Sequence, residues 1–258
     1  EAGLTEKEFN HLKELYAWKK EHTHLLINAA DRIDPSKGLL ERIRILDLLL
    51  FKNPDLVDKV CFAMFVPNSR MDVEEYRNYN QKFKDAVKAF NKKYSGQTHG
   101  RDIIKLFEGD ANRKALRAAY HITDIHFASS KRDGYHLGPN ESVMSLVNHH
   151  EEGDKKTVGM SLKEYHHALI EGSAPQEKTR PCLYVMSDEI GVAKTGFAKN
   201  ALLYNPLDIQ AGAEQLQEAI TILQKRPEEA IARTQALQLH SLNNDMLKWA
   251  ENNISGLH

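Results

Sequence analysis

Cysteine is scarce in this 258-residue chain, which contains two, Cys61 and Cys182. Two cysteines are too few for the disulfide framework of a small secreted domain or for a zinc finger. Both lie in apolar segments typical of buried strands, so we expect a reducing, cytoplasmic setting. The chain begins at Glu1 without a methionine or a signal-peptide pattern, and we therefore expect a processed or truncated start.

Long hydrophobic runs and an excess of charge of one sign are also missing. The longest apolar stretch, residues 45–51, is interrupted by Asp47 and is far shorter than the roughly 20 residues that span a bilayer. The 35 basic and 36 acidic residues give a net charge of -1, which favours neither nucleic acid nor an anionic membrane as the main partner. Only 14 glycines and 8 prolines are present, which excludes a collagen-like or wholly disordered chain.

Short apolar runs alternate with longer stretches of helical periodicity along most of the chain. This alternation is typical of β-α units around a parallel sheet. We therefore predict an α/β fold with a Rossmann-like parallel sheet flanked by helices and a helical carboxyl-terminal cap. The expected strands cover residues 23–29, 60–66, 103–107, 122–128, 182–186 and 201–204, and the expected helices cover residues 5–20, 39–51, 72–93 and, in the cap, 208–258.

A single domain over residues 1–258 accounts for this pattern, because no internal repeat or linker divides it. One polar segment, residues 148–180, interrupts the alternation of strands and helices. Its charged runs and its serine and proline residues predict a long surface insertion.

Two permanent cations follow the first predicted strand. Arg32 and Lys37 lie five residues apart, just before a helix, in a loop at the carboxyl end of that strand. Open parallel sheets bind ligands at this edge, and an arginine with a lysine suits a diphosphate. The alternative is an ordinary surface loop in which Arg32 pairs with Asp31 or Asp34, and the spacing does not decide between the two.

A glycine-bearing loop follows the predicted strand at residues 122–128. Gly134 and Gly138 lie close together, and Pro139 stands at the expected start of a short helix, an arrangement that favours backbone contacts to phosphate. Glu141 falls in the first turn of that helix, where a carboxylate can accept hydrogen bonds from two ribose hydroxyls. It can equally serve to stabilise the helix dipole.

The thirteen histidines suggest a metal site at first sight. The adjacent pairs at residues 149–150 and 166–167 point apart on a helix, and no pair has the i, i+4 spacing with a glutamate base found in zinc hydrolases. We therefore expect no metal. The chain also lacks the nucleophile elbow, the Walker loop and the dinucleotide glycine motif, so a hydrolase, an NTPase and a dehydrogenase are disfavoured.

Taken together, the loops resemble the carboxyl-terminal, nucleotide-sugar-binding half of trehalose-6-phosphate synthases, the retaining GT-B glycosyltransferases of family 20. The similarity lies in five blocks that keep their order along nearly the whole chain. The blocks are Asp31-Arg32-Ile33-Asp34 with Lys37-Gly38 and Glu41-Arg42; Pro67 and Ser69-Arg70 with Asp72-Val73 and Tyr76; Arg132-Asp133-Gly134 with Leu137 and Glu141; Asn205-Pro206 with Asp208; and Asn244-Asp245 with Trp249.

The resemblance implies transfer of glucose from UDP-glucose to glucose 6-phosphate with retention of the anomeric configuration, without a metal or other cofactor. It implies catalytic roles for Arg32 and Lys37 at the departing diphosphate and for Asp133 at the donor sugar. It further implies that the acceptor is bound by an amino-terminal domain absent from this chain, so that the isolated chain is expected to be inactive. The implied substrate-binding residues are Gly134, Tyr135, His136, Leu137, Glu141 and Arg70.

The chain also departs from the family pattern. His136 and Asn140 stand where the family has asparagine and lysine, and Glu189 replaces an aromatic residue in a later loop. These departures leave two alternatives open: a non-catalytic regulatory or scaffold subunit of a trehalose synthase complex, and a related transferase with another nucleotide donor. The sequence decides neither the nucleotide base nor whether the protein forms homo-oligomers.

Overall fold

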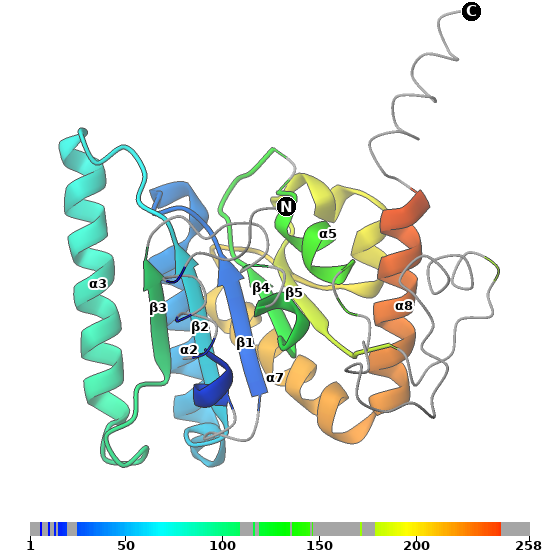
Figure 1. The fold of residues 1–258 in the computed structure, drawn as a ribbon, viewed down its shortest axis with the longest axis horizontal. Coiled ribbons are helices and arrows are strands. Elements are labelled where there is room, and N and C mark those ends of the chain that lie inside the picture. Colours follow the sequence, from blue (N-terminus) through cyan, green and yellow to red (C-terminus); the bar gives the residue numbers. More distant parts are fainter. Residues whose placement is uncertain are drawn as a thin grey trace, which may run out of the picture.

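The computed structural model describes residues 15–19, 25–108, 119–134, 136–144 and 179–243, together with residues 6, 10, 13, 116, 146 and 171. Its centre is a six-stranded sheet in the order β3-β2-β1-β4-β5-β6, and every pairing between neighbouring strands is parallel (Figure 1). The strands are β1 (Leu25–Ala30), β2 (Val60–Val66), β3 (Ile104–Glu108), β4 (Ile125–Ala128), β5 (Leu183–Ser187) and β6 (Leu202–Tyr204). This is the Rossmann-like sheet that the alternation of apolar runs predicts.

Three long helices cover one face of the sheet. They are α2 (Leu39–Lys52), α3 (Glu74–Tyr94) and α7 (Ile209–Lys225), and α2 packs against both others. Side chains alternate between the two faces of a strand. Ile27 and Ala29 of β1 therefore join the large apolar core under these helices, with Phe62 of β2 and Phe127 of β4.

The opposite face carries two smaller apolar clusters. One holds Leu15 and Trp18 against Leu26 of β1 and Phe65 of β2. The other lies under α5 (Gly138–Val143) and α8 (Pro227–Asn243), towards the end of the sheet that is farther from β3 (Figure 1). The helices expected from residue 208 are α7 and α8 up to Asn243, and α7 packs on β5 and β6 as part of the core rather than only capping the end.

The expected strand over residues 122–128 is wrong at its start, because β4 begins only at Ile125. The preceding residues form a turn in which Asp124 accepts hydrogen bonds from the Leu26 amide (2.7 Å), Lys19 (2.8 Å) and Arg180 (3.1 Å). The backbone of Asp124 still bonds to both neighbouring strands, because its N–H donates to the Leu26 carbonyl oxygen (2.9 Å) and its own carbonyl oxygen accepts from the Leu183 amide (2.9 Å). Similarly, α3 begins at Glu74 rather than at residue 72.

Several sequence-based expectations fall outside the described residues. They concern the first residue of the helix expected over residues 5–20, most of the segment 148–180, Tyr135 and the terminal block with Asn244 and Trp249. The prediction of one domain over residues 1–258 stays a prediction. None of the helices in the described ranges combines the length and the hydropathy that a membrane span requires.

Candidate functional site

A pocket of about 300 Å³ opens where the loops after β1 and β4 meet. These strands are neighbours in the sheet, but the chain leaves β1 towards α2 on one face and β4 towards α5 on the other. In open parallel sheets such a change of direction leaves a crevice at the carboxyl ends of the strands, and ligands bind there. The pocket is lined by Ala30, Asp31, Arg32, Lys37, Leu116, Tyr120, His136, Gly138 and Glu141.

The loop after β1 is shaped by its own polar side chains. Asp34 caps the short 3-10 helix η1 (Pro35–Lys37) by accepting hydrogen bonds from the Ser36 amide (2.9 Å) and the Ser36 hydroxyl (2.7 Å). Gly38 follows with φ of 65°, in the left-handed region that favours glycine. The tight turn brings Lys37 back over the end of β1 and towards the pocket.

Arg32 lies on the pocket wall and is also paired with an aspartate. Its Nη2 is 3.2 Å from Asp34 Oδ2, and 52% of its side chain is exposed. Although burial acts to raise the pKa of Asp34, hydrogen bonds from Ser36 and the charge of Arg32 hold this pKa below its ordinary value. Arg32 thus pairs with Asp34 and lines the pocket at the same time, and about half of its side chain is accessible to a ligand.

Arg70 does not line the pocket. It has φ of 48°, and its Nη1 donates to the Tyr76 hydroxyl (2.9 Å), which lies 3.4 Å from Asp34 Oδ2. Arg70 is thus linked to Arg32 through Tyr76 and Asp34, on an exposed rim beside the pocket.

Lys37 lies between two carboxylates. Its ammonium group pairs with Asp133 and is 4.0 Å from Asp31 Oδ1, and 13% of its side chain is exposed. Asp133 does not line the pocket directly. A single parallel bridge between Asp133 and Ile190 fixes its backbone beside the loop after β5.

Asp31 connects several of these groups. Its Oδ2 accepts a 2.7 Å hydrogen bond from Arg42, which is fully buried and also donates to Ser129 Oγ (2.9 Å). Its Oδ1 faces Lys37 and, at 3.5 Å, His136 Nε2. A buried carboxylate requires such partners, because desolvation of an unpaired charge costs several kcal/mol.

The loop after β4 supplies the other wall. Helix α5 begins at Gly138 with Pro139 in its first turn, as predicted, and Glu141 of the same turn lines the pocket. Gly134 and Leu137 are exposed and do not line it. Tyr135 lies outside the described residues. The helix has only six residues, so any anion binding here depends mainly on side chains and local amides.

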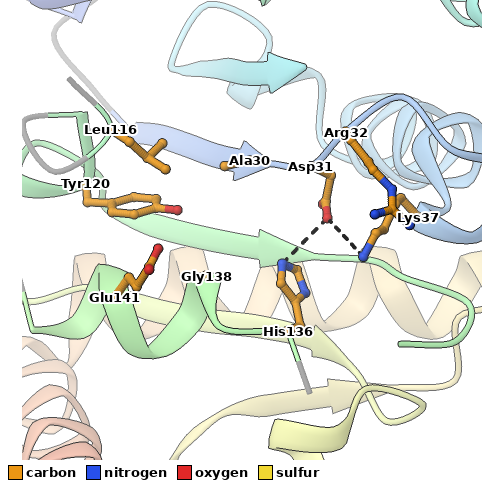
Figure 2. Close-up of a pocket in the computed structure, with 9 residues that line it drawn as sticks. All are labelled: Ala30, Asp31, Arg32, Lys37, Leu116, Tyr120, His136, Gly138 and Glu141. Carbon is orange, nitrogen blue, oxygen red and sulfur yellow. Dashed lines mark ion pairs between the residues drawn. The ribbon is translucent and has the colours of Figure 1, made fainter. Parts of the chain in front are cut away.

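The pocket has two chemically different ends (Figure 2). Arg32 and Lys37 lie at one end, with His136 beside them, whereas Glu141 and Tyr120 lie at the other. Burial raises the pKa of Tyr120 far above its ordinary value, so its phenol is neutral. A ligand with an anionic group at one end and hydroxyl groups at the other fits this polarity.

Sequence reasoning missed part of this wall. Leu116 and Tyr120 precede β4 in the chain. They reach the pocket because this part of the chain packs on the face of the sheet that also carries Leu15 and Trp18. No motif marks them. Asp31 stands inside the first block of the resemblance, and its position directly after an apolar strand was the signal for a pocket residue.

The described residues contain no group of three or more histidine, cysteine, aspartate or glutamate side chains placed to hold a metal ion. The metal-free chemistry that the sequence predicts stays a prediction.

The strand order and the pocket between β1 and β4 define a Rossmann-type α/β protein with a ligand site at the topological switch point. The chain belongs to glycosyltransferase family 20, whose family model matches residues 3–258. The expected family and fold class are therefore confirmed.

Several relatives resemble the chain over most of its length. It is 28% identical over 231 residues to the trehalose-6-phosphate synthase of Escherichia coli O9:H4 (strain HS). These aligned residues cover 90% of this chain and 41% of the relative. A trehalose-6-phosphate structure from E. coli, bound with UDP-2-fluoro glucose, is 25% identical with a TM-score of 0.74, over 95% of this chain and 46% of that one. An α,α-trehalose-phosphate synthase (UDP-forming) from Burkholderia xenovorans, in complex with glucose-6-phosphate, shares the fold with 24% identity and a TM-score of 0.75, over 95% and 46% of the two chains. The chain thus spans less than half the length of these relatives.

Proposed function

We propose that this chain is the donor-binding domain of a retaining glycosyltransferase that transfers glucose from UDP-glucose to glucose 6-phosphate, giving trehalose 6-phosphate. The observation that carries the proposal is the convergence of Arg32, Lys37 and Glu141 on one pocket at the switch point of the sheet. Membership of family 20 and the UDP-sugar analogue bound to the E. coli relative support the choice of donor.

In this reaction the basic end of the pocket receives the diphosphate. Arg32 can donate two hydrogen bonds to phosphate oxygens, and Lys37 adds a compact positive charge. The bond from the sugar to the diphosphate breaks, and negative charge develops on the leaving group. The attraction of both side chains to the diphosphate becomes stronger as this charge develops. They supply in this proposal the stabilisation that a metal ion provides in other transferases.

The other end of the pocket suits the nucleoside. The carboxylate of Glu141 can accept hydrogen bonds from both ribose hydroxyls, while Tyr120 and Leu116 offer an apolar wall. In the same proposal Asp133 contacts the donor sugar, and the acceptor is bound mainly by a further, amino-terminal domain outside these 258 residues.

Titration calorimetry with UDP-glucose tests the donor site. The unsubstituted chain is expected to bind the nucleotide sugar, and Lys37→Ala is expected to weaken binding by roughly 10- to 150-fold, which corresponds to a lost charge-assisted hydrogen bond of about 1.5 to 3 kcal/mol. Lys84→Ala is a matched control, because Lys84 also pairs with a carboxylate, Glu108 (2.8 Å), but lies on α3 away from the pocket. Equal affinities for the two variants contradict the proposal.

A further inference from the structure

His136 stands in an unusual backbone position on the pocket wall. Its φ of 60° lies in the left-handed region, and only 8% of its side chain is exposed. The ring points into the space between the two loops, where Nε2 faces Asp31 (Figure 2). Its Nδ1 is buried and has no hydrogen-bond partner among the described residues. The largely buried ring therefore faces one carboxylate with Nε2, and its other nitrogen has no hydrogen-bond partner in the described part of the chain.

The charged groups around His136 nearly cancel one another. From the loop after β1, Asp31 faces the ring, and Lys37 and the buried Arg42 share that carboxylate. Glu141 of α5 lines the same pocket, and the neighbouring ring of β4, His126, is kept neutral because burial lowers its pKa to about 3. Tyr120 is neutral as well, because burial raises its pKa.

The permanent cations of the pocket are thus already paired. Arg32 is paired with Asp34, and Lys37 with Asp133. A diphosphate that enters this pocket brings two negative charges into a site whose own charges are nearly balanced. Among the described residues that line the pocket, His136 is the side chain of the type that changes between a neutral and a positive form near neutral pH.

We propose that His136 takes up a proton from the solvent when a nucleoside diphosphate sugar binds, and that the resulting imidazolium, placed between Asp31 and the diphosphate, acts as a third cationic ligand of the phosphates. The inference rests on the proposed function and adds to it a proton-coupled binding step. The physical cause is that an anion within a few ångströms favours the charged form of a histidine. Because binding then takes up a proton, the affinity for the nucleotide sugar must rise as the pH falls.

Calorimetry in buffers of different ionisation enthalpy measures this proton directly. UDP-glucose is the appropriate probe, because each of its phosphates carries one constant negative charge near neutrality, whereas the terminal phosphate of UDP titrates near pH 6. At about pH 7.5 the unsubstituted chain is expected to take up a substantial fraction of one proton per nucleotide sugar bound. Its affinity is expected to fall with rising pH by up to about tenfold per pH unit.

His136→Asn is the matched variant. Asparagine tolerates the left-handed backbone conformation but cannot take up a proton in this range. The variant is expected to bind UDP-glucose without proton uptake, with an affinity that varies little from about pH 6 to 8 and that is lower than that of the unsubstituted chain at the acidic end. His136→Gln provides a second, longer neutral side chain, and thermal unfolding shows whether each variant is folded.

The possible results separate the two proposals. Binding by the unsubstituted chain with no net proton uptake overturns the inference and leaves the donor site intact. Uptake that persists in both folded variants also overturns it, because the proton then resides on another group. A complete absence of UDP-glucose binding overturns the proposed function together with the inference.

Discussion

Gly38→Ala tests whether the two pocket loops lie as close together as the structure shows. Gly38 has φ of 65°, and a Cβ at this position would overlap the backbone carbonyl oxygen of Ser129, just after β4. The Ser129 hydroxyl lies 3.0 Å from the Lys37 carbonyl oxygen and 3.2 Å from that of Gly38. An added methyl group must therefore push the turn that carries Lys37 away from β4.

The expected loss of stability in Gly38→Ala has two parts, and alanine variants at other glycines of the chain allow them to be measured separately. The left-handed conformation costs a non-glycine residue about 1 kcal/mol. The overlap with a backbone atom, which cannot move away as a side-chain end can, adds about 2 kcal/mol. Gly38→Ala should therefore lower the free energy of unfolding by about 3 kcal/mol, and the melting temperature by roughly 6 to 12 °C.

Urea unfolding of three alanine variants isolates the close approach. Gly100 has φ of 82°, and no atom lies within 4 Å of the place that a Cβ would take, so Gly100→Ala should show only the backbone cost of about 1 kcal/mol. Gly96 has the same open space without the positive φ, and Gly96→Ala should change stability by less than about 1 kcal/mol. Gly38→Ala alone should also weaken UDP-glucose binding. If it is no more destabilising than Gly100→Ala, the two loops are not in contact.

Three further predictions concern buried groups. Arg42→Met should cost about 3 to 5 kcal/mol in urea unfolding, because it leaves the Asp31 carboxylate without its shortest ion pair (2.7 Å); a loss below about 1 kcal/mol would show that this pair is not buried. Tyr184→Phe removes a buried 3.0 Å hydrogen bond to Ser142 and should cost about 1 to 2 kcal/mol, whereas unchanged stability would contradict that bond. Burial lowers the pKa of His126 from 6.5 to about 3. Below pH 6.5 the unfolded chain therefore binds a proton at this residue that the native chain does not bind. The free energy of unfolding should then decrease by about 1.4 kcal/mol for each unit by which the pH is lowered. His126→Leu should reduce this slope by that amount in unfolding curves recorded from about pH 7 to 5, and an unchanged slope would refute the assignment.

The sheet was predictable because its strands are short and apolar on both faces. Val60–Val66 matches the expected strand residue for residue, and every residue in it is buried. The partners of a polar side chain are harder to predict: Asp124 stands next to an apolar run, but its partners Lys19 and Arg180 are far away in sequence. Their contacts arise only in the folded chain and cannot be read from local periodicity.

The candidate site was predictable where charged side chains directly follow strands of the parallel sheet. Arg32 and Lys37 follow one strand, Glu141 follows another, and the parallel sheet brings the ends of both strands to one edge. The wall formed by Tyr120 was not predictable, because it depends on how the segment before β4 crosses the sheet. The role of Asp31 as a shared partner of Arg42, Lys37 and His136 likewise follows from packing rather than from spacing.

A crystal structure of the chain with UDP-glucose bound tests the central claim most directly, namely that the pocket between β1 and β4 holds the donor. The diphosphate oxygens should lie within hydrogen-bonding distance of Arg32 and Lys37, and the ribose hydroxyls should contact Glu141. A nucleotide sugar bound at another edge of the sheet, or one that leaves both basic side chains paired only with Asp34 and Asp133, would contradict the account.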